Sequence, residues 1–349
     1  MKRNRAIDYE KGIIVAVMVL CHVLQFFGRP DAHPEQRTIM LIINFTAFST
    51  FMFAYGRSTA VAYLSRPWKS AAPRMLKSAL RSYIAFVISG VSYLVLCEGK
   101  DFSSKIVRRV LTFDAVPGWS EFLAAFAALG LVSLLLLPLL KKLSGSGKLT
   151  LICGVVCFAC TFIPYGMIGD NRLGLLTGTY SFSCFPVLQY LPFFLAGLYV
   201  GQNGMPKLKW WLIVSGAATA AAVTWLVVFG EPRRFPPSLM WLLLPCLLIV
   251  LLDRGAELLG RWADRRRWAE AALSPVASMG MNSLFYLLAS NIVIFAVSRM
   301  GTLPTYRKSE IFPFSLEQGS TPWALFWTLA LLLLIGFTAG LTRKGGKRR

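Results

Sequence analysis

Residues 4–28, NRAIDYEKGIIVAVMVLCHVLQFFG, decide the fold of this chain. The stretch begins with charged residues, continues from Gly12 as an apolar run, and carries an imidazole, His22, inside that run. A run of this length and polarity is typical of a transmembrane helix. A titratable side chain at membrane depth is costly, so His22 is by default a functional candidate. The alternative is a histidine that is hydrogen-bonded between packed helices.

One face of this predicted helix carries two polar groups of different kinds. Lys11 and His22 are 11 residues apart, which corresponds to about 16 Å along a helix axis and an angular offset of about 20°. A cation at one end of the span and an imidazole beyond its midpoint are therefore expected to point in the same direction.

Apolar runs recur along the whole chain. The sequence is 56% hydrophobic and 15% charged, with a mean hydropathy of +0.58, which is too apolar for an ordinary soluble domain. The runs are centred on residues 12–28, 38–56, 80–97, 121–140, 149–168, 186–201, 210–229, 237–252, 281–299 and 322–342. We therefore predict an all-α, polytopic membrane protein of about ten transmembrane helices, with residues 1–349 forming a single integral-membrane domain.

The distribution of charge predicts the orientation. The net charge is +21, and 25 of the 37 Lys and Arg residues fall in the segments that would be cytoplasmic if the N-terminus were inside. This excess follows the positive-inside rule and predicts that both termini are cytoplasmic. It also excludes nucleic acid as the expected partner, because the positive charge is spread over the inner loops of a membrane protein.

Other simple classes are not supported by the sequence. Seven cysteines lie mostly within the apolar runs, and no His or carboxylate accompanies them at metal-ligand spacing, so we expect neither a metal site nor a disulfide framework. Asp8 and Glu10 interrupt the basic N-terminal region, and no small-residue cleavage site follows. We expect a retained first span rather than a signal peptide.

The most basic predicted inner segment leads into the third span. Arg74, Lys77 and Arg81 are spaced i, i+3 and i+7, which predicts one cationic stripe on a helix. The stripe suits a polyanionic ligand, and it equally suits anionic lipid head groups at the membrane surface.

Two predicted outer loops carry polar residues. Lys105, Arg108 and Arg109 lie at helical spacing in the loop 98–119, against the topological bias, and indicate either an interfacial helix or a contact for an anionic acceptor. The glycine-bearing loop 169–185 is predicted to line an outer vestibule. Trp119 closes the first of these loops, where a tryptophan suits the membrane interface, and Glu121 is expected at the membrane border beside it.

The ninth apolar run places polar side chains at membrane depth. These side chains are Asn282, Ser283, Ser290 and Asn291. They suit hydrogen bonds between helices as well as the lining of a pocket.

Several of these residues together resemble a known pattern. Arg5 and Asp8 are followed by Lys11-Gly12, and ten residues separate Lys11 from His22. Further matches are Arg74-Met75-Leu76-Lys77 after Gly56, Trp119-Ser120-Glu121-Phe122-Leu123, and Phe194-Leu195-Ala196-Gly197. The chain resembles acyltransferase family 3 within the transmembrane acyltransferase superfamily. It departs from the family at two arginine positions that are lysine here and at a C-terminal histidine, where Gly280-Met281-Asn282-Ser283-Leu284 is closer to heparan-glucosaminide-acetyltransferase-like relatives.

The resemblance implies O-acyl transfer, usually of acetyl, from cytoplasmic acyl-CoA to a hydroxyl of an extracytoplasmic glycan or lipid-linked saccharide. Acetyl-CoA would be a co-substrate, and no permanently bound cofactor is expected. The expected roles are catalytic for His22, Asp8 and Glu121, acyl-CoA binding for Arg5, Lys11, Arg74, Lys77 and Arg81, and substrate binding for Trp119, Asn282 and Ser283. The expected location is the plasma (inner) membrane as a multi-pass protein in contact with membrane lipid.

The residues themselves are compatible with this chemistry. A neutral imidazole at His22 can take the proton of an acceptor hydroxyl that attacks a thioester. Two other functions remain open at this stage: a secondary transporter or flippase for an anionic saccharide or lipid, and a non-catalytic membrane scaffold. The acceptor sugar, the acyl chain and the oligomeric state are not determined by the sequence.

Overall fold

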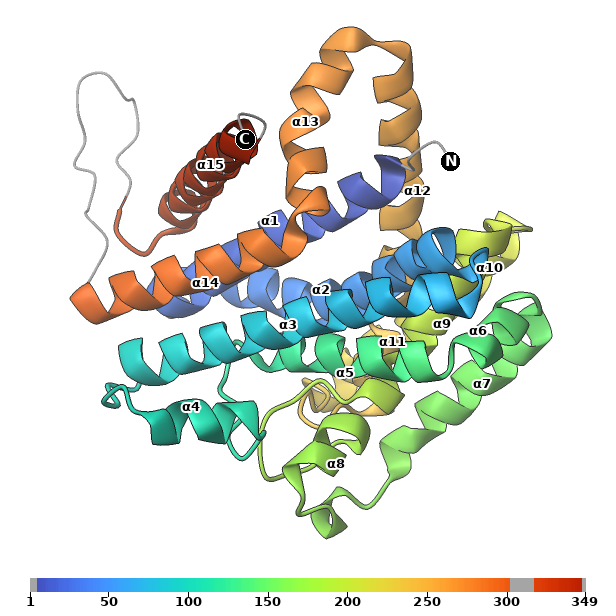
Figure 1. Cartoon of the computed structure of the whole chain (residues 1–349), viewed down its shortest axis with the longest axis horizontal. Coiled ribbons are helices and arrows are strands. Elements are labelled where there is room, and N and C mark those ends of the chain that lie inside the picture. The colour runs from blue at the N-terminus through green and yellow to red at the C-terminus, as the bar shows by residue number, and fades with distance from the viewer. Residues whose placement is uncertain (1–4, 302–316, 347–349) are drawn as a thin grey trace. The chain divides into compact units, whose positions relative to one another are not determined.

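The computed structural model describes residues 5–301 and 317–346, with side chains to residue 339 (Figure 1). These residues form helices joined by short loops, and the described part of the chain contains no β-strand. Each apolar run in the sequence is mainly helical, as expected for segments whose backbone groups must be satisfied without water. The all-α prediction is confirmed.

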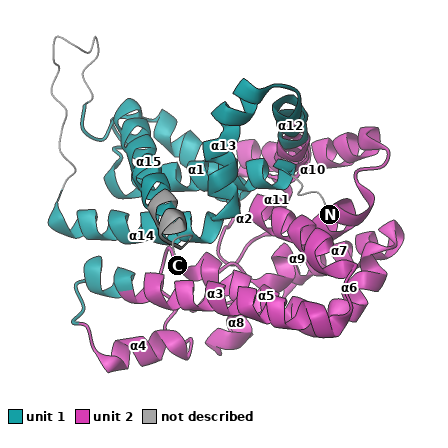
Figure 2. Ribbon diagram, turned by 45° about the horizontal axis from the view of Figure 1, so that its top comes forward, with its two compact units in different colours: residues 1–47, 92–101, 256–349 teal, residues 48–91, 102–255 magenta. Residues whose placement is uncertain are grey.

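The chain divides into two compact units, which Figure 2 colours separately. Unit 1 comprises residues 1–47, 92–101 and 256–349, and unit 2 comprises residues 48–91 and 102–255. Helices α2 (Glu35–Thr59), α3 (Trp68–Leu96) and α12 (Cys246–Arg265) each run from one unit into the other. The prediction of a single domain over 1–349 stays a prediction.

Unit 1 is organised around the N-terminal helix. Besides parts of α2, α3 and α12, it contains α1 (Arg5–Phe27), α13 (Arg267–Met281), α14 (Ser283–Met300) and α15 (Thr321–Gly346). Helix α1 packs against α13, α14 and α15, and the side chains of Tyr9, Ala256 and Ala263 are buried together near its start. The deciding stretch of the sequence is thus the central helix of its unit.

Unit 2 contains the remaining elements. These are η1 (Ala60–Leu64), α4 (Ser104–Leu111), α5 (Glu121–Leu135), α6 (Leu137–Ser144), α7 (Gly147–Ala159), η2 (Cys160–Phe162), η3 (Tyr165–Met167), α8 (Asn171–Thr177), α9 (Val187–Asn203), α10 (Leu208–Phe229) and α11 (Leu239–Leu243). Helix α9 packs against α5, α6, α7 and α8.

Helices α2 and α9 cross at very short range inside unit 2. A Cβ atom added to Gly56 would lie 2.1 Å from the carbonyl oxygen of Phe194, and one added to Gly197 would lie 2.0 Å from that of Phe53. No side chain fits at such distances, so both positions require glycine for the helices to approach. Gly56 and Gly197 thus have the same role, one on each of the two crossing helices.

Seven helical segments of the described residues are long and apolar enough to cross a membrane. They are Arg5–Phe27, Glu35–Leu64, Trp68–Leu96, Leu208–Phe229, Leu239–Arg265, Ser283–Met300 and Thr321–Ala339. Helices α5 and α6 meet at an angle of 85° and would make an eighth span if counted as one. The chain is a multi-pass membrane protein, but the count of ten spans and the cytoplasmic position of both termini are not confirmed.

The difference in the span count has a physical reason. Helix α7 has 13 residues and α9 has 17, which correspond to about 20 Å and 25 Å of helix, less than the ~30 Å of a bilayer core. Apolar composition alone marks both segments as spans, whereas helix length does not.

Two helices differ from what their local sequence predicts. Residues 253–270, DRGAELLGRWADRRRWAE, have the pattern of an amphipathic, cationic surface helix, but α12 continues without a break from Cys246 to Arg265 and α13 begins at Arg267. Pro73 is typical of the first turn of a helix, but α3 begins at Trp68, so Pro73 lies inside the helix. In both cases the helix extends further than the local signals indicate.

Candidate functional site

His22 is buried in α1 and bonded to a residue near the other end of the sequence. Its Nδ1 atom lies 2.9 Å from Oδ1 of Asn291, which belongs to α14 in the same unit. The exposed fraction is 8% for His22 and 0% for Asn291. The lone histidine of the first span is therefore held between packed helices by a specific partner.

The partner determines which ring nitrogen can act as a base. An amide oxygen can only accept a hydrogen bond, so Nδ1 of His22 must carry the proton in this arrangement. In that tautomer the lone pair is on Nε2. This is the relationship by which a carbonyl or carboxylate orients an imidazole for general-base catalysis.

The neighbouring polar residues of α1 contact α2 within unit 1. The Gln25 amide nitrogen donates to Oδ1 of Asn44 over 3.5 Å, and the Cys21 thiol donates to the same oxygen over 3.6 Å. Two consecutive residues, Cys21 and His22, are thus directed to different helices. These bonds fix the rotation of α1 about its axis at the depth of His22.

Close packing against α13 fixes the other half of α1. A Cβ atom on Gly12 would lie 2.0 Å from the Val276 carbonyl oxygen, and one on Gly280 would lie 1.8 Å from the Asp8 carbonyl oxygen. Two glycines, one on each helix, permit this approach. Gly12 belongs to the Lys11-Gly12 pair of the motif, so its structural role is to place α1 against α13.

The predicted residues at the start of α1 lie close to charged groups of α12 and α13. Arg5 forms ion pairs with Asp264 over 3.3 Å and with Glu270 over 2.7 Å. Asp8 is buried and Lys11 is half-buried. Because its guanidinium already faces two carboxylates, the charge of Arg5 is partly compensated before any anionic ligand binds.

Asn282 and Ser283 mark a break between two helices. Asn282 separates α13 from α14, and its side-chain amide donates to the Ser278 carbonyl oxygen over 2.8 Å. Ser283 is half-buried at the first position of α14. The structure thus gives Asn282 a part in shaping the joint, while the substrate-binding role of both residues stays a prediction.

The predicted cationic stripe is present in unit 2. Arg74, Lys77 and Arg81 are exposed on one helix, α3. Three cations therefore share the exposed side of α3, in a unit different from that of His22.

Trp119 and Glu121 lie at the beginning of α5, also in unit 2. Trp119 has a positive φ of 57°, uncommon for a residue other than glycine, and it turns the chain into the helix. Ser120 donates to Ser89 over 2.8 Å. The Glu121 side chain is buried, and its Oε2 atom accepts no hydrogen bond from the described residues. The carboxyl is therefore inside the unit, where we had expected a site at the membrane border.

One buried ion pair escaped the sequence reasoning. Arg57 of α2 and Asp253 of α12 are paired inside unit 2, with exposed fractions of 3% and 0%, and Arg254 Nε also donates to Asp253 over 3.0 Å. By hydropathy, both residues lie at the ends of apolar runs, where a charged side chain can reach water and needs no ion-pair partner. In the described residues, no group of three or more His, Cys, Asp or Glu side chains could hold a metal ion.

The comparison with known families agrees with this arrangement. A family model described as an acyltransferase domain, that of acyltransferase family 3, matches residues 4–343. The chain belongs to acyltransferase family 3. No curated protein and no solved structure matched the chain. As a member of acyltransferase family 3 with several apolar helices of spanning length, the protein is a membrane acyltransferase.

Proposed function

We propose that this acyltransferase moves an acyl group, most simply acetyl, from acyl-CoA to a hydroxyl, with His22 as the general base. The observation that carries the proposal is the 2.9 Å contact between His22 Nδ1 and the amide oxygen of Asn291. It supports a neutral imidazole whose lone pair is on Nε2, the nitrogen that would accept the proton. Asn291 is then a positioning residue, which fixes the tautomer and the ring plane.

The proposed reaction balances without any further group. Nε2 of His22 takes the proton of the acceptor hydroxyl as the hydroxyl oxygen attacks the thioester carbonyl carbon. The tetrahedral intermediate collapses with cleavage of the carbon–sulfur bond. The CoA thiolate leaves and takes the proton back from the imidazolium, so that the products are the ester and free CoA. Asp8 and Glu121 remain predicted contributors, with no step assigned to them.

The cations of α3 support an anionic donor. Arg74, Lys77 and Arg81 are exposed on α3, and Arg66 lies two residues before this helix begins. A phosphate-rich molecule such as acyl-CoA suits such a group, because charge-assisted hydrogen bonds to phosphate are the strong ones. With the predicted cytoplasmic N-terminus, this end of α3 would face the compartment that contains acyl-CoA. Lys11 and Arg5, which belong to unit 1, stay predicted contacts for the acyl donor.

The proposed acceptor is a glycan or a lipid-linked saccharide on the outer side of the plasma (inner) membrane. This follows from the predicted topology, in which the loops 98–119 and 169–185 are both extracytoplasmic. The two loops are in contact, since the Asn171 amide donates to the Phe113 carbonyl oxygen over 3.1 Å. The contact agrees with their being on one side of the membrane.

The decisive experiment uses the purified full-length chain in nanodiscs with radiolabelled acetyl-CoA. We expect acetyl-CoA hydrolysis or transfer that is lost in His22→Ala and retained in His33→Ala, which removes the other histidine of the chain. Equal CoA release by both variants would exclude His22 as the base. Movement of a saccharide across the membrane without any CoA release would favour the transporter instead.

A further inference from the structure

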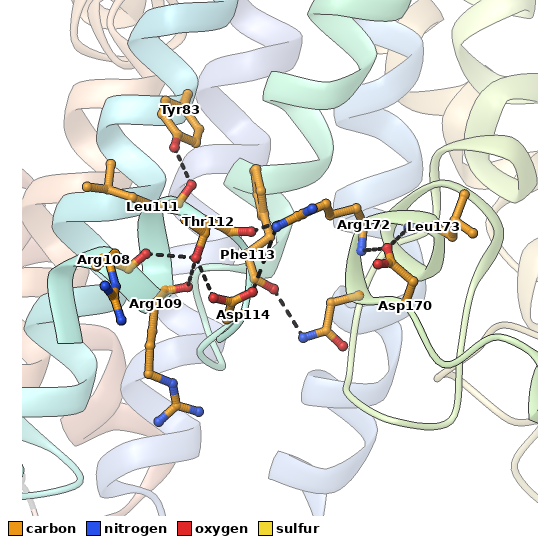
Figure 3. Close-up of polar contacts among 11 residues, drawn as sticks. Tyr83, Arg108, Arg109, Leu111, Thr112, Phe113, Asp114, Asp170, Arg172 and Leu173 are labelled. Atoms are coloured by element: carbon orange, nitrogen blue, oxygen red, sulfur yellow. Dashed lines mark hydrogen bonds and ion pairs between the residues drawn. The ribbon is translucent and has the colours of Figure 1, made fainter. Parts of the chain in front are cut away.

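A cleft opens in unit 2 between the end of α4 and the start of α8. Its volume is about 290 Å³, and its lining consists of Phe113, Asp114, Gly169, Asp170, Asn171 and Arg172. Figure 3 shows the side chains of Asp114, Asp170 and Arg172 around this position. The cleft is slightly smaller than the ~300–1,000 Å³ of common small-molecule pockets, so it suits one ring of a larger ligand.

Side-chain bonds to backbone hold the two walls together. Asn171 donates to the Phe113 carbonyl oxygen over 3.1 Å, and Arg172 Nε donates to that of Thr112 over 3.2 Å. Phe113 has a positive φ of 60°, and its ring stacks on Phe86 at 5.3 Å between centroids. The α4 side of the cleft is therefore fixed by packing, and the α8 side is tied to it.

The same residues leave hydrogen-bonding atoms available. Oδ1 of Asp170 accepts from the backbone N–H of Arg172 over 2.8 Å and of Leu173 over 3.0 Å. Within residues 5–301 and 317–346, no hydrogen bond engages Asp170 Oδ2 or Asn171 Oδ1. Arg172 Nη2 lies 3.9 Å from Asp114 Oδ1, which is an ion pair without a direct hydrogen bond. The cleft thus offers two acceptors and a guanidinium donor.

This set of atoms distinguishes between classes of ligand. A metal ion is disfavoured because the Arg172 guanidinium lines the same cleft. An anion is disfavoured by Asp114 and Asp170. Hydrogen bonds from the N–H groups of Leu173 and Arg172 lower the pKa of Asp170, so this carboxylate is ionised at neutral pH. The class of ligand that remains is a neutral molecule whose hydroxyl groups both donate and accept hydrogen bonds.

We propose that this cleft binds one sugar ring of a hydroxyl-rich saccharide through adjacent hydroxyl groups. One hydroxyl donates to Asp170 Oδ2 and the next donates to Asn171 Oδ1 while accepting from Arg172. The proposal rests on the proposed function in identifying this saccharide with the acyl acceptor. It assigns the recognition of the acceptor to side chains of α8 and its preceding residue, outside every candidate span.

The test is saturation-transfer NMR with the full chain in nanodiscs and the methyl glycosides of glucose, galactose, mannose and rhamnose. We expect at least one glycoside to bind the wild type. Asp170→Asn should weaken that binding about tenfold or more, the loss expected for one hydrogen bond to a charged group. Asparagine caps a helix as well as aspartate does, so α8 should keep its fold. The amide NH2 group then replaces Oδ2, so that an acceptor in the cleft becomes a donor. Asp101→Asn, an identical change at an exposed residue, should have no effect.

Three results would overturn the proposal. The first is no glycoside binding to the wild type, the second is equal binding by Asp170→Asn, and the third is a thermal shift with Ca²⁺ that Asp170→Asn abolishes. The proposed function is judged separately by His22-dependent CoA release without glycoside. CoA release without glycoside binding would exclude the cleft alone, and glycoside binding without acyl transfer would exclude the acyltransfer reaction alone.

Discussion

Nδ1 of His22 lies 2.9 Å from Oδ1 of Asn291, although 268 residues separate the two in the chain. The contact joins the first helix of the protein to α14 and makes the amide oxygen the acceptor for the imidazole N–H. Both residues are buried, so water cannot replace this hydrogen bond without a large cost in free energy. The amide oxygen selects the tautomer with its lone pair on Nε2, which is the form that a general base at this nitrogen requires.

Replacing either member of the pair should affect the same step. We expect His22→Ala to reduce kcat by about 10²–10⁴, the usual contribution of a general base. We expect Asn291→Ala to reduce it by about 10–100-fold, as loss of an orienting partner does, with little change in KM for acetyl-CoA. Steady-state CoA release with a thiol reagent measures both.

The double variant separates an orienting role from a structural one. If Asn291 acts through the imidazole, Asn291→Ala should cost almost nothing in the His22→Ala background. Ser290→Ala removes an adjacent buried hydroxyl that donates to the Leu287 carbonyl oxygen, and it serves as the matched control with kcat near that of the wild type. Additive losses in the double variant would contradict the assignment.

Helix α1 should tolerate no side chain where it crosses α13. Gly12→Ala and Gly280→Ala would each place a Cβ about 2 Å from a carbonyl oxygen of the partner helix, and such overpacking costs about 1–3 kcal/mol. Gly255→Ala is the matched control, because nothing lies within 4 Å of its added Cβ, and it should gain stability by about 0.5–1 kcal/mol. Thermal unfolding in detergent tests this, and unchanged stability of Gly12→Ala would contradict the close crossing.

The sequence identifies His22 but not its partner, and the reason is geometric. A single imidazole in an apolar run stands out locally, whereas a partner far along the chain depends on how the helices pack. The ninth apolar run offers Asn282 and Asn291, which are nine residues apart and would face opposite sides of a regular helix, about 180° from one another. We selected Asn282 from its place in the family pattern. The structure places Asn282 at a helix break and Asn291 at the imidazole.

The lengths and ends of the helices are a second feature that the sequence does not predict. Apolar composition locates every membrane helix, but it cannot show that α5 and α6 bend by 85° between Leu135 and Leu137. Nor does it show that α2 continues past Arg57 through the π-helical turn η1 to Leu64. These features come from packing partners in the tertiary structure, and they decide whether a charged residue ends in a loop or in the core.

The thiol of Cys184 reports on the interior position of Glu121. Burial, with a smaller contribution from the negative charge of Glu121, raises the pKa of the Cys184 thiol to about 12. Only about one thiol in ten thousand is then ionised at pH 8, and the thiolate is the reactive form. We expect mass spectrometry to find Cys184 unmodified by N-ethylmaleimide in the folded protein at pH 8 and fully modified in SDS.

Glu121→Gln provides the control for this measurement. Removing the negative charge should lower the pKa of Cys184 and increase its slow labelling, whereas Glu231→Gln, the same change at an exposed residue, should not. Labelling of Cys184 at the rate of a free thiol in the folded wild type would show that the segment between α8 and α9 does not cover it.

The buried pair of Arg57 and Asp253 should be the most sensitive charged position in unit 2. Asp253→Asn removes the carboxylate from a guanidinium that is only 3% exposed, and breaking a buried pair in this way costs about 3–5 kcal/mol.

Asp264→Asn is the matched control on the same helix, α12. Its carboxylate pairs with Arg5 at the surface with 56% of the side chain exposed, so it should cost less than about 1 kcal/mol. Replacing both members, as Arg57→Met with Asp253→Leu, should restore part of the stability, because a well-packed apolar pair needs no charge partner, although Arg254 loses its bonds to Asp253. Thermal unfolding of the four proteins in the same detergent decides the matter. If Asp253→Asn unfolds at the same temperature as the wild type, the two charges do not meet inside the unit.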